Sequence, residues 1–299
     1  MPSTPSPHES SPLPSLGLQL LRAAVARKPA RGADVPRLEV QARHVMPDTA
    51  QLARYGEACG SAADGFLPPL FPQVLALPLH LELLNRPEFP YRLLGMVHVR
   101  NLVRQHQRIP EGQPLDVRCW VEGQREVRLG RELDLHTRVE LDGKLAWEAI
   151  TTMLRRLPGA QPREQHARAT GPGADEALFA ESQPADWNVP ANTGWRYARA
   201  SGDFNPIHLH ALTARPFGFQ RAIAHGMWTL GRCVAELGEA AKVPALTITC
   251  DFRRPLLLPA RVHFQTARTG PAIAFRVSSD EGKAYLLGRL TPGAAPALD

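Results

Sequence analysis

The chain has 299 residues and a formal net charge of +6, because 35 Lys and Arg stand against 29 Asp and Glu. Hydrophobic residues make up 43% and charged residues 21%, a composition that supports packed cores and excludes general disorder. No run of five basic residues occurs, so the charge does not favour nucleic-acid binding. A mildly basic surface would suit an anionic small molecule or an acidic carrier protein.

No apolar stretch reaches the length of about 18 residues that a membrane helix needs, so no membrane association is expected. Residues 1–15 lack the basic start of a secretory signal and are predicted to form a disordered tail. The four cysteines are far apart and form no CxxC pair, which predicts free thiols in a reducing compartment and a cytoplasmic location. They are Cys59, Cys119, Cys233 and Cys250.

Three short patterns recur in the same order in the two halves of the chain, at an offset of about 140 residues. The matched sets are Pro47 and Tyr55 with Pro190 and Tyr197, Pro110, Pro114 and Val117 with Pro255, Pro259 and Val262, and Gly143-Lys144 with Gly282-Lys283. This repetition predicts two copies of one module, over residues 16–157 and 176–299. The Pro-, Gly- and Ala-rich residues 158–175 between them are predicted to be a linker.

Strands are predicted wherever apolar and polar residues alternate with a period of two. The first copy shows this over 115–122 and 132–141, followed by a strand over 144–154. In the second copy four strands are predicted, at 246–252, 261–267, 273–278 and 284–290. The short turns between these runs favour an antiparallel sheet.

One apolar helix precedes the strands in each copy. In the second copy Met227, Leu230, Val234 and Leu237 share one face, and Gly231 would permit close packing. The first copy has a similar face at Val74, Leu77, Leu81 and Leu84, interrupted by Pro78. Neither a helix nor a meander of strands buries its apolar face alone. The prediction is therefore an α+β fold of two tandem hot dogs, in which an antiparallel sheet wraps around a central helix in each half.

The densest group of polar residues lies between Tyr197 and His208. Gly202 loosens the backbone there, and Pro206 holds the preceding residue extended, so Asp203 and His208 are predicted to lie on a shaped turn. A carboxylate and an imidazole brought together in this way can share acid–base work on one water molecule. The alternative is a turn whose side chains only bind their own backbone.

The pair His225-Gly226 stands where the apolar helix of the second copy begins. Helix N-termini present unpaired N–H groups and a partial positive charge, and glycine lets a ligand approach its amide closely. Gly226 could therefore bind an oxyanion, although a glycine at a helix start can also be a simple cap. Beside an acid–base pair, such an amide suggests stabilisation of an enolate next to a carbonyl group.

The segments YARASGDFNPIH and GFQRAIAHGM closely resemble the hydratase-2 motif of MaoC-like dehydratases and (R)-specific enoyl-CoA hydratases. The resemblance implies the reversible hydration of trans-2-enoyl thioesters to (3R)-3-hydroxyacyl thioesters, without a metal or cofactor, on a substrate carried by coenzyme A or acyl carrier protein. It implies that Asp203 and His208 are the catalytic pair and that the Gly226 amide binds the thioester oxygen. The implied supporting residues are Ser201, Asn205 and His225. One departure is His210, where many relatives carry an acidic or amide residue.

The first copy lacks this set, since residues 55–64 contain no Asp-x-x-x-x-His pattern and no His-Gly pair precedes Val74. One active site per chain is expected, with the first copy shaping a tunnel for the acyl chain. Arg253 and Arg254, near a strand end, could meet coenzyme A phosphates or form a solvated pair. The chain could also form a homodimer.

Three alternative functions would each require something different of the sequence. A metal site at His208, His210 and His225 would need a further ligand, and no carboxylate or cysteine completes it at short range in the sequence. A hot-dog thioesterase would need a carboxylate near the start of the central helix, whereas Glu236 lies almost three turns away. A noncatalytic acyl-thioester-binding subunit would have no use for Asp203, His208 and Gly226 together.

Overall fold

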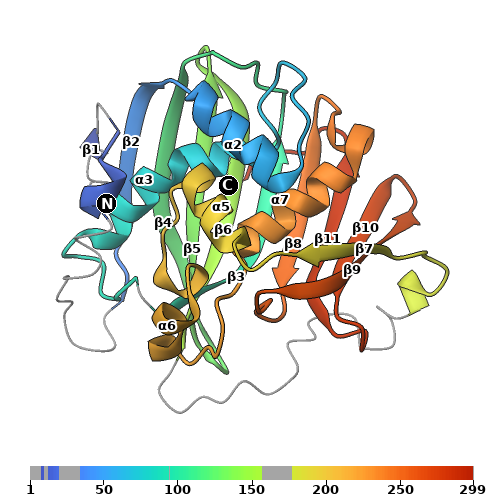
Figure 1. The fold of residues 1–299 in the computed structure, drawn as a ribbon. Coiled ribbons are helices and arrows are strands. Elements are labelled where there is room, and N and C mark those ends of the chain that lie inside the picture. The colour runs from blue at the N-terminus through green and yellow to red at the C-terminus, as the bar shows by residue number, and fades with distance from the viewer. Residues whose placement is uncertain (1–7, 10–12, 20–33, 94, 157–176, 299) are drawn as a thin grey trace.

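The computed structural model describes residues 8–9, 13–19, 34–93, 95–156 and 177–298 (Figure 1). The predicted linker at 158–175 lies outside these residues. So does most of the predicted tail at 1–15, within which His8–Glu9 form strand β1. The predicted module boundaries stay predictions. Below, the first module means residues 38–156 and the second module means residues 185–292.

Within these described residues, eleven strands form one sheet in the order β1-β2-β4-β5-β6-β3-β8-β11-β10-β9-β7. Every named pair is antiparallel except the short parallel pair of β1 and β2. The first module contributes β2 (Leu38–Val45), β3 (Met96–Gln105), β4 (Leu115–Val127), β5 (Gly130–Leu141) and β6 (Lys144–Arg156). The second contributes β7 (Ala185–Val189), β8 (Leu246–Phe252), β9 (Ala260–Thr269), β10 (Ala272–Ser278) and β11 (Ala284–Pro292).

The strand order of one module mirrors that of the other, and β3 and β8 join them in the middle of the sheet. Their pairing runs from Arg100 opposite Asp251 to Gln105 opposite Leu246. The repeated sequence patterns occupy equivalent places. Pro114 and Pro259 immediately precede β4 and β9, and the glycines of the two Gly-Lys pairs turn in the left-handed region, with φ of 71° and 74°. The predicted repeat is thus an internal pseudo-twofold symmetry.

Helices α3 (Phe71–Asn85) and α7 (Gly226–Glu236) lie against the concave face of the sheet, one in each module (Figure 1). Both match the predicted apolar helices. Helix α3 is buried along almost its whole length because the sheet lies beneath it and other helices cover it. The predicted α+β fold, an antiparallel sheet wrapped around a helix in each half, is confirmed. Among the described helices, none is both long and apolar enough to cross a bilayer.

Two further helices, α2 (Thr49–Cys59) and α5 (Thr193–Ser201), were not predicted. They pack against each other, and the rings of Tyr55 and Tyr197 lie 6.1 Å apart at this contact. Helix α2 also packs across the module boundary on α7. A Cβ atom at Gly231 would lie 2.9 Å from both the Cys59 sulfur and the Tyr55 hydroxyl, so the predicted role of Gly231 in close packing is confirmed. All four cysteines are free and buried.

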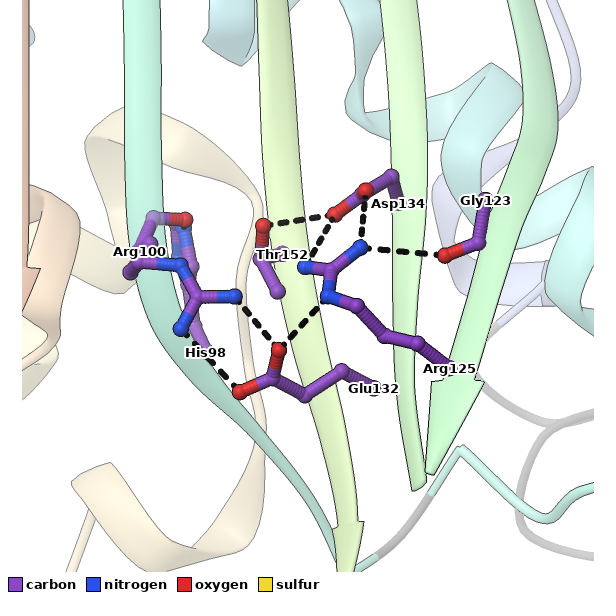
Figure 2. A network of polar contacts seen from close by, with 7 residues as sticks. All are labelled: His98, Arg100, Gly123, Arg125, Glu132, Asp134 and Thr152. Carbon is purple, nitrogen blue, oxygen red and sulfur yellow. Dashed lines mark hydrogen bonds and ion pairs between the residues drawn. The ribbon is translucent and has the colours of Figure 1, made fainter. Parts of the chain in front are cut away.

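The outer face of the sheet carries a charged network in place of helices (Figure 2). Arg125 binds Glu132 at 2.9 Å and Asp134 at 3.1 Å, and Arg100 binds the same Glu132 at 3.0 Å. Burial alone would raise the pKa of Glu132, but its two arginine partners lower it on balance. The two faces of the sheet therefore differ in chemistry, and only the concave face holds the two central helices.

Candidate active site

The predicted catalytic turn begins where α5 ends. Gly202 stops the helix with φ of 82°, a left-handed conformation that suits glycine. The Ser201 hydroxyl donates to the Tyr197 carbonyl at 2.9 Å and accepts the Asp203 N–H at 3.1 Å. The Asp203 carboxylate in turn accepts the Asn205 N–H at 3.1 Å. Side chains of this turn therefore bind their own backbone, as the alternative prediction held, and these bonds fix where Asp203 stands.

His208 is positioned by the residues on both sides of Pro206. Asn205 is extended, with φ of −56° and ψ of 124°, and its side chain accepts the Ile207 N–H at 3.4 Å at the start of the 3-10 helix η1 (Pro206–His208). His208 Nδ1 lies 2.8 Å from the Ile223 carbonyl. Because a carbonyl can only accept, Nδ1 carries the hydrogen, and a neutral His208 presents the lone pair of Nε2.

Gly194, which the sequence analysis missed, allows this turn to lie directly on α5. A Cβ atom at Gly194 would be 1.8 Å from the His208 carbonyl oxygen, which no side chain could tolerate. The sequence carried no clear signal for this contact, because α5 was not predicted and Gly194 is only the second residue of that helix.

His225 holds Asp203 and His208 together. Its Nε2 donates to the Asp203 backbone carbonyl at 2.9 Å and lies 3.9 Å from the Asp203 carboxylate. Its ring stacks on the His208 ring with centroids 3.7 Å apart, and the Tyr197 ring covers it at 4.9 Å. The structure thus brings together the predicted residues Ser201, Asp203, Asn205, His208 and His225.

Burial governs the charge state of both histidines. It lowers the pKa of His208, although the Asp203 charge and the hydrogen bond to Ile223 act in the opposite direction. It lowers the pKa of His225 to about 3, and the neighbouring His208 adds to the shift. Both rings are therefore neutral near pH 7. The Asp203 side chain is 40% exposed, so the pair is open to a substrate on the carboxylate side.

The metal alternative needs a correction. Asp203 does supply a carboxylate near the two histidines: one of its oxygens and one ring nitrogen each of His208 and His225 lie within 4.8 Å of one another. His210 is elsewhere: its Nδ1 accepts the Leu212 N–H at the start of α6 (Ala211–Ala214). Stacked imidazole rings direct their lone pairs side by side, whereas a metal ion needs them to converge, so the arrangement does not fit a metal.

Gly226 is the first residue of α7, one residue after His225. No side chain caps this helix start, so the N–H groups of its first turn remain available. A Cβ atom at Gly226 would lie 2.9 Å from the ring of Phe252, at the end of β8. Phe252 was not predicted as a site residue. Its ring forms a wall beside the Gly226 amide.

Arg253 and Arg254 are not brought to this place. Arg253 follows Phe252 and points to the opposite face of the sheet, where it lies 3.5 Å from Asp251. There it lines a pocket of about 510 Å³ together with Arg100 and Arg289. Arg254 shares the Tyr285 carbonyl as a backbone acceptor, at 3.3 Å. Their contact with coenzyme A phosphates stays a prediction.

The first module also reaches this site through β3, which the sequence did not reveal. The His98 ring lies 4.7 Å from the Phe252 ring, and the Asn101 amide lies 3.4 Å from the sulfur of Met227. Burial lowers the pKa of His98 to about 4, while a backbone hydrogen bond to Arg100 and the Asp203 charge act in the opposite direction. The wall facing the start of α7 is therefore made by both modules.

Two mirrored halves that share one sheet, with a carboxylate–imidazole pair at the start of one central helix, define an enzyme of the double hot-dog class. The family described as "MaoC like domain" matches residues 175–286. The "3-hydroxyacyl-thioester dehydratase X" of Mycobacterium tuberculosis is 31% identical over 243 residues, which are 81% of this chain and 85% of that protein. The chain belongs to the MaoC-like dehydratase family.

Solved structures agree with this assignment. The crystal structure of HtdX from Mycobacterium tuberculosis superposes with a TM-score of 0.72 at 26% identity, covering 86% of this chain and 100% of that one. A second Mycobacterium tuberculosis protein, described as having a double hotdog fold, gives a TM-score of 0.53 at 14% identity over 90% of this chain and 96% of that one. This second likeness concerns the fold alone.

Proposed function

We propose that the protein is a hydro-lyase that reversibly hydrates trans-2-enoyl thioesters to (3R)-3-hydroxyacyl thioesters in fatty-acid or polyketide-type metabolism. Membership of the MaoC-like dehydratase family and the similarity to a 3-hydroxyacyl-thioester dehydratase support the reaction class. The observation that carries the proposal is the placement of the Asp203 carboxylate within 4.8 Å of a His208 ring nitrogen, next to the uncapped start of α7.

In the hydration direction, one water molecule bridges Asp203 and His208. Asp203 accepts a proton from this water as its oxygen bonds to the β-carbon, and His208 delivers a proton to the α-carbon. Hydration therefore begins with the one mobile proton of the pair on His208 Nε2 and ends with it on Asp203, from which it returns to His208 before the next turnover. Dehydration reverses each step and begins with that proton on Asp203 and with His208 neutral, the form of the imidazole that burial favours.

The negative charge that develops on the thioester oxygen needs its own partner. The Gly226 amide at the start of α7 supplies an N–H donor together with the positive end of the helix. An acid–base group contributes about 10²–10⁴-fold and one oxyanion donor about 10²–10³-fold, so both are needed for an efficient reaction. In this scheme Ser201, Asn205 and His225 are positioning residues.

Two further parts of the proposal are the carrier of the thioester and the cellular compartment. The thioester is carried by coenzyme A or acyl carrier protein, and none of the steps above requires a metal or cofactor. The free, buried state of all four cysteines supports a reducing, cytoplasmic compartment. Comparison of kcat/KM for the two forms of one acyl group would identify the carrier.

The hot-dog thioesterase remains the rival activity, and the structure gives it little support. Glu236 stands at the end of α7 and forms an ion pair with Arg232 at 2.8 Å, far from the helix start. Incubation of the purified protein with crotonyl-CoA and a longer trans-2-enoyl-CoA separates the alternatives. Loss of enoyl absorbance without free thiol indicates hydration, release of free thiol indicates thioester cleavage, and binding without either change indicates a noncatalytic subunit.

A further inference from the structure

A polar cluster lies inside the first module, beneath the start of α3. Thr151 of β6 stands at its centre: its hydroxyl oxygen accepts from the Gln73 amide at 2.9 Å and lies 3.4 Å from the Asn101 amide. Gln73, Asn101 and Thr151 are 8%, 3% and 5% exposed. The cluster is therefore withdrawn from solvent on the concave face of the sheet.

Two atoms of this cluster have no hydrogen-bond partner among the described residues. They are Oε1 of Gln73 and Oδ1 of Asn101, both buried side-chain oxygens. Rotation of either amide would leave a buried N–H group in the place of the oxygen. A buried polar atom without a partner costs about 1–3 kcal/mol, so each of these positions calls for a hydrogen-bonding group that the described residues do not supply.

The fold itself does not require polar residues here. Counting from the matched turn glycines Gly143 and Gly282, Thr151 corresponds to Leu290. Asn101 pairs with Thr151 as Ile248 pairs with Leu290, so Asn101 corresponds to Ile248. Both counterparts are fully buried and apolar. The same sheet positions are thus filled by hydrocarbon in the second module and by an amide and a hydroxyl in the first.

The cluster adjoins the proposed active site. The Asn101 amide lies 3.4 Å from the sulfur of Met227, the residue after Gly226, and 3.3 Å from Nε2 of His98. In the proposed function the thioester oxygen rests on the Gly226 amide, and the contact between Asn101 and Met227 places the cluster next to this helix start. The polar atoms would then flank the chain beyond the reacting carbons.

We propose that the first module binds an acyl chain bearing a hydroxyl group, which Asn101, Thr151 and Gln73 recognise by hydrogen bonds. A hydroxyl both donates and accepts, so it satisfies either orientation of the two amides. A saturated hydrocarbon chain at the same place would leave them unpaired, and a site built to bind a hydroxyl discriminates strongly against the analogue that lacks it. This inference rests on the proposed hydratase function and names its substrate class.

The test compares kcat/KM for (E)-hex-2-enoyl-CoA with kcat/KM for its 5-hydroxy and 6-hydroxy derivatives. For the native protein we expect one hydroxylated substrate to be preferred about 10- to 100-fold. Asn101→Leu is expected to bring this ratio close to one by lowering kcat/KM more for the hydroxylated substrate than for the unsubstituted one. Thr151→Val is the second variant: valine keeps the branched shape of threonine but lacks the hydroxyl, and it should shift the ratio in the same direction.

Thr152→Val is the matched control. Thr152 is the next residue of β6, its hydroxyl binds Asp134 on the outer face, and the substitution should leave the ratio unchanged. A native ratio of one or below, or an equal loss for all three substrates in Thr151→Val, would overturn the inference while leaving the hydratase intact. The absence of hydration of every enoyl-CoA would overturn the proposed function and the inference together.

Discussion

The two modules follow the same plan as far as the glycine that ends their first helix, and they diverge immediately after it. Helices α2 and α5 both stop at a left-handed glycine, Gly60 and Gly202. Ser61 follows the first glycine, whereas Asp203 follows the second. The connection to the central helix then spans residues 60–70 in the first module and 202–225 in the second. The longer connection carries Asp203, His208 and His225, so the residues proposed for catalysis stand in only one of two halves that share a frame.

The buried cores of the two modules also differ, and here the first module carries the polar residues. Where the second module buries Ile248 and Leu290, the first buries Asn101 and Thr151. The module that carries the acid–base pair has the apolar core, and its partner has the polar interior. Under the two proposals above, the second module holds the reacting carbons and the first module recognises the acyl chain.

The largest expected effect concerns the connection in which the modules differ. Asp203→Asn and His208→Ala should each lower kcat for enoyl-CoA hydration by about 10²–10⁴-fold, because each removes one partner in proton transfer. Thermal unfolding should change little in Asp203→Asn, since the Asp203 side chain is substantially exposed. His208→Ala removes a buried ring and should also lower Tm, so its kcat is compared at a temperature where the variant is folded. Ser61→Ala, at the equivalent position of the first module, is the control and should retain native turnover. Native kcat in either catalytic variant would exclude that residue from the mechanism.

The next effect separates two glycines of one helix. Gly226→Ala should lower kcat by up to about 10²–10³-fold with a small change in Tm, since its Cβ would displace the Phe252 ring beside the proposed oxyanion donor. Gly231→Ala should instead lower the free energy of unfolding by about 1–3 kcal/mol, because its Cβ would press on buried Cys59 and Tyr55. Steady-state kinetics and chemical denaturation of both variants distinguish a catalytic glycine from a packing glycine. If Gly226→Ala and Gly231→Ala lost activity and stability in the same proportion, the two glycines would not have these separate roles.

A smaller effect is expected from acid. Burial lowers the pKa of His80 in the first module and of His225 in the second to about 3. In the unfolded chain these groups titrate near pH 6.5. As the pH falls below that value, the unfolded state therefore binds protons that the folded state does not bind. The free energy of unfolding should therefore fall by about 1.4 kcal/mol per pH unit for each such histidine until the pH nears 3.

Chemical denaturation between pH 7.5 and 5 measures this slope. His80→Gln removes one titrating group from the first module, so its slope should be shallower than that of the native protein by about one proton. An unchanged slope would show that His80 is protonated as easily in the folded state as in the unfolded chain.

The smallest expected effect lies within the catalytic pair. The Asp203 charge raises the pKa of His208 against the lowering caused by burial. In Asp203→Asn the His208 ring should therefore titrate at a lower pH than in the native protein, which NMR of the imidazole resonances can follow. A titration at the same or a higher pH would mean that the carboxylate and the ring do not sense each other.

Local patterns were enough to predict most of the frame. Period-two alternation located β4 and β5, four further runs in the second half located β8 to β11, and the apolar spacing from Met227 located α7. Strands β2, β3 and β7 were not predicted. The turn from Ser201 to His208 was predicted because Gly202 frees the backbone for a left-handed conformation and Pro206 restricts the residue before it. In each of these cases the residues that specify the structure are neighbours in the chain.

What the sequence did not reveal depends on distant partners. Strand β3 has a shift in register between His98 and Arg100 that breaks its alternation, and its place beside β8 is a pairing between modules. The positions of His98 and Phe252 follow from that pairing. The missing ligand of the metal alternative has the same cause, because the fold of the turn, and not the spacing, brings Asp203 beside two histidines.

The junction of β3 and β8 also settles how the sheet is completed. A separated half would present one of these strands as a bare row of N–H and C=O groups, the kind of edge that recruits other chains into aggregates. Within one polypeptide each strand finds its neighbour without an encounter between molecules, so dilution does not oppose the joining. Fusion of the two halves therefore protects the most vulnerable edge of each at any protein concentration.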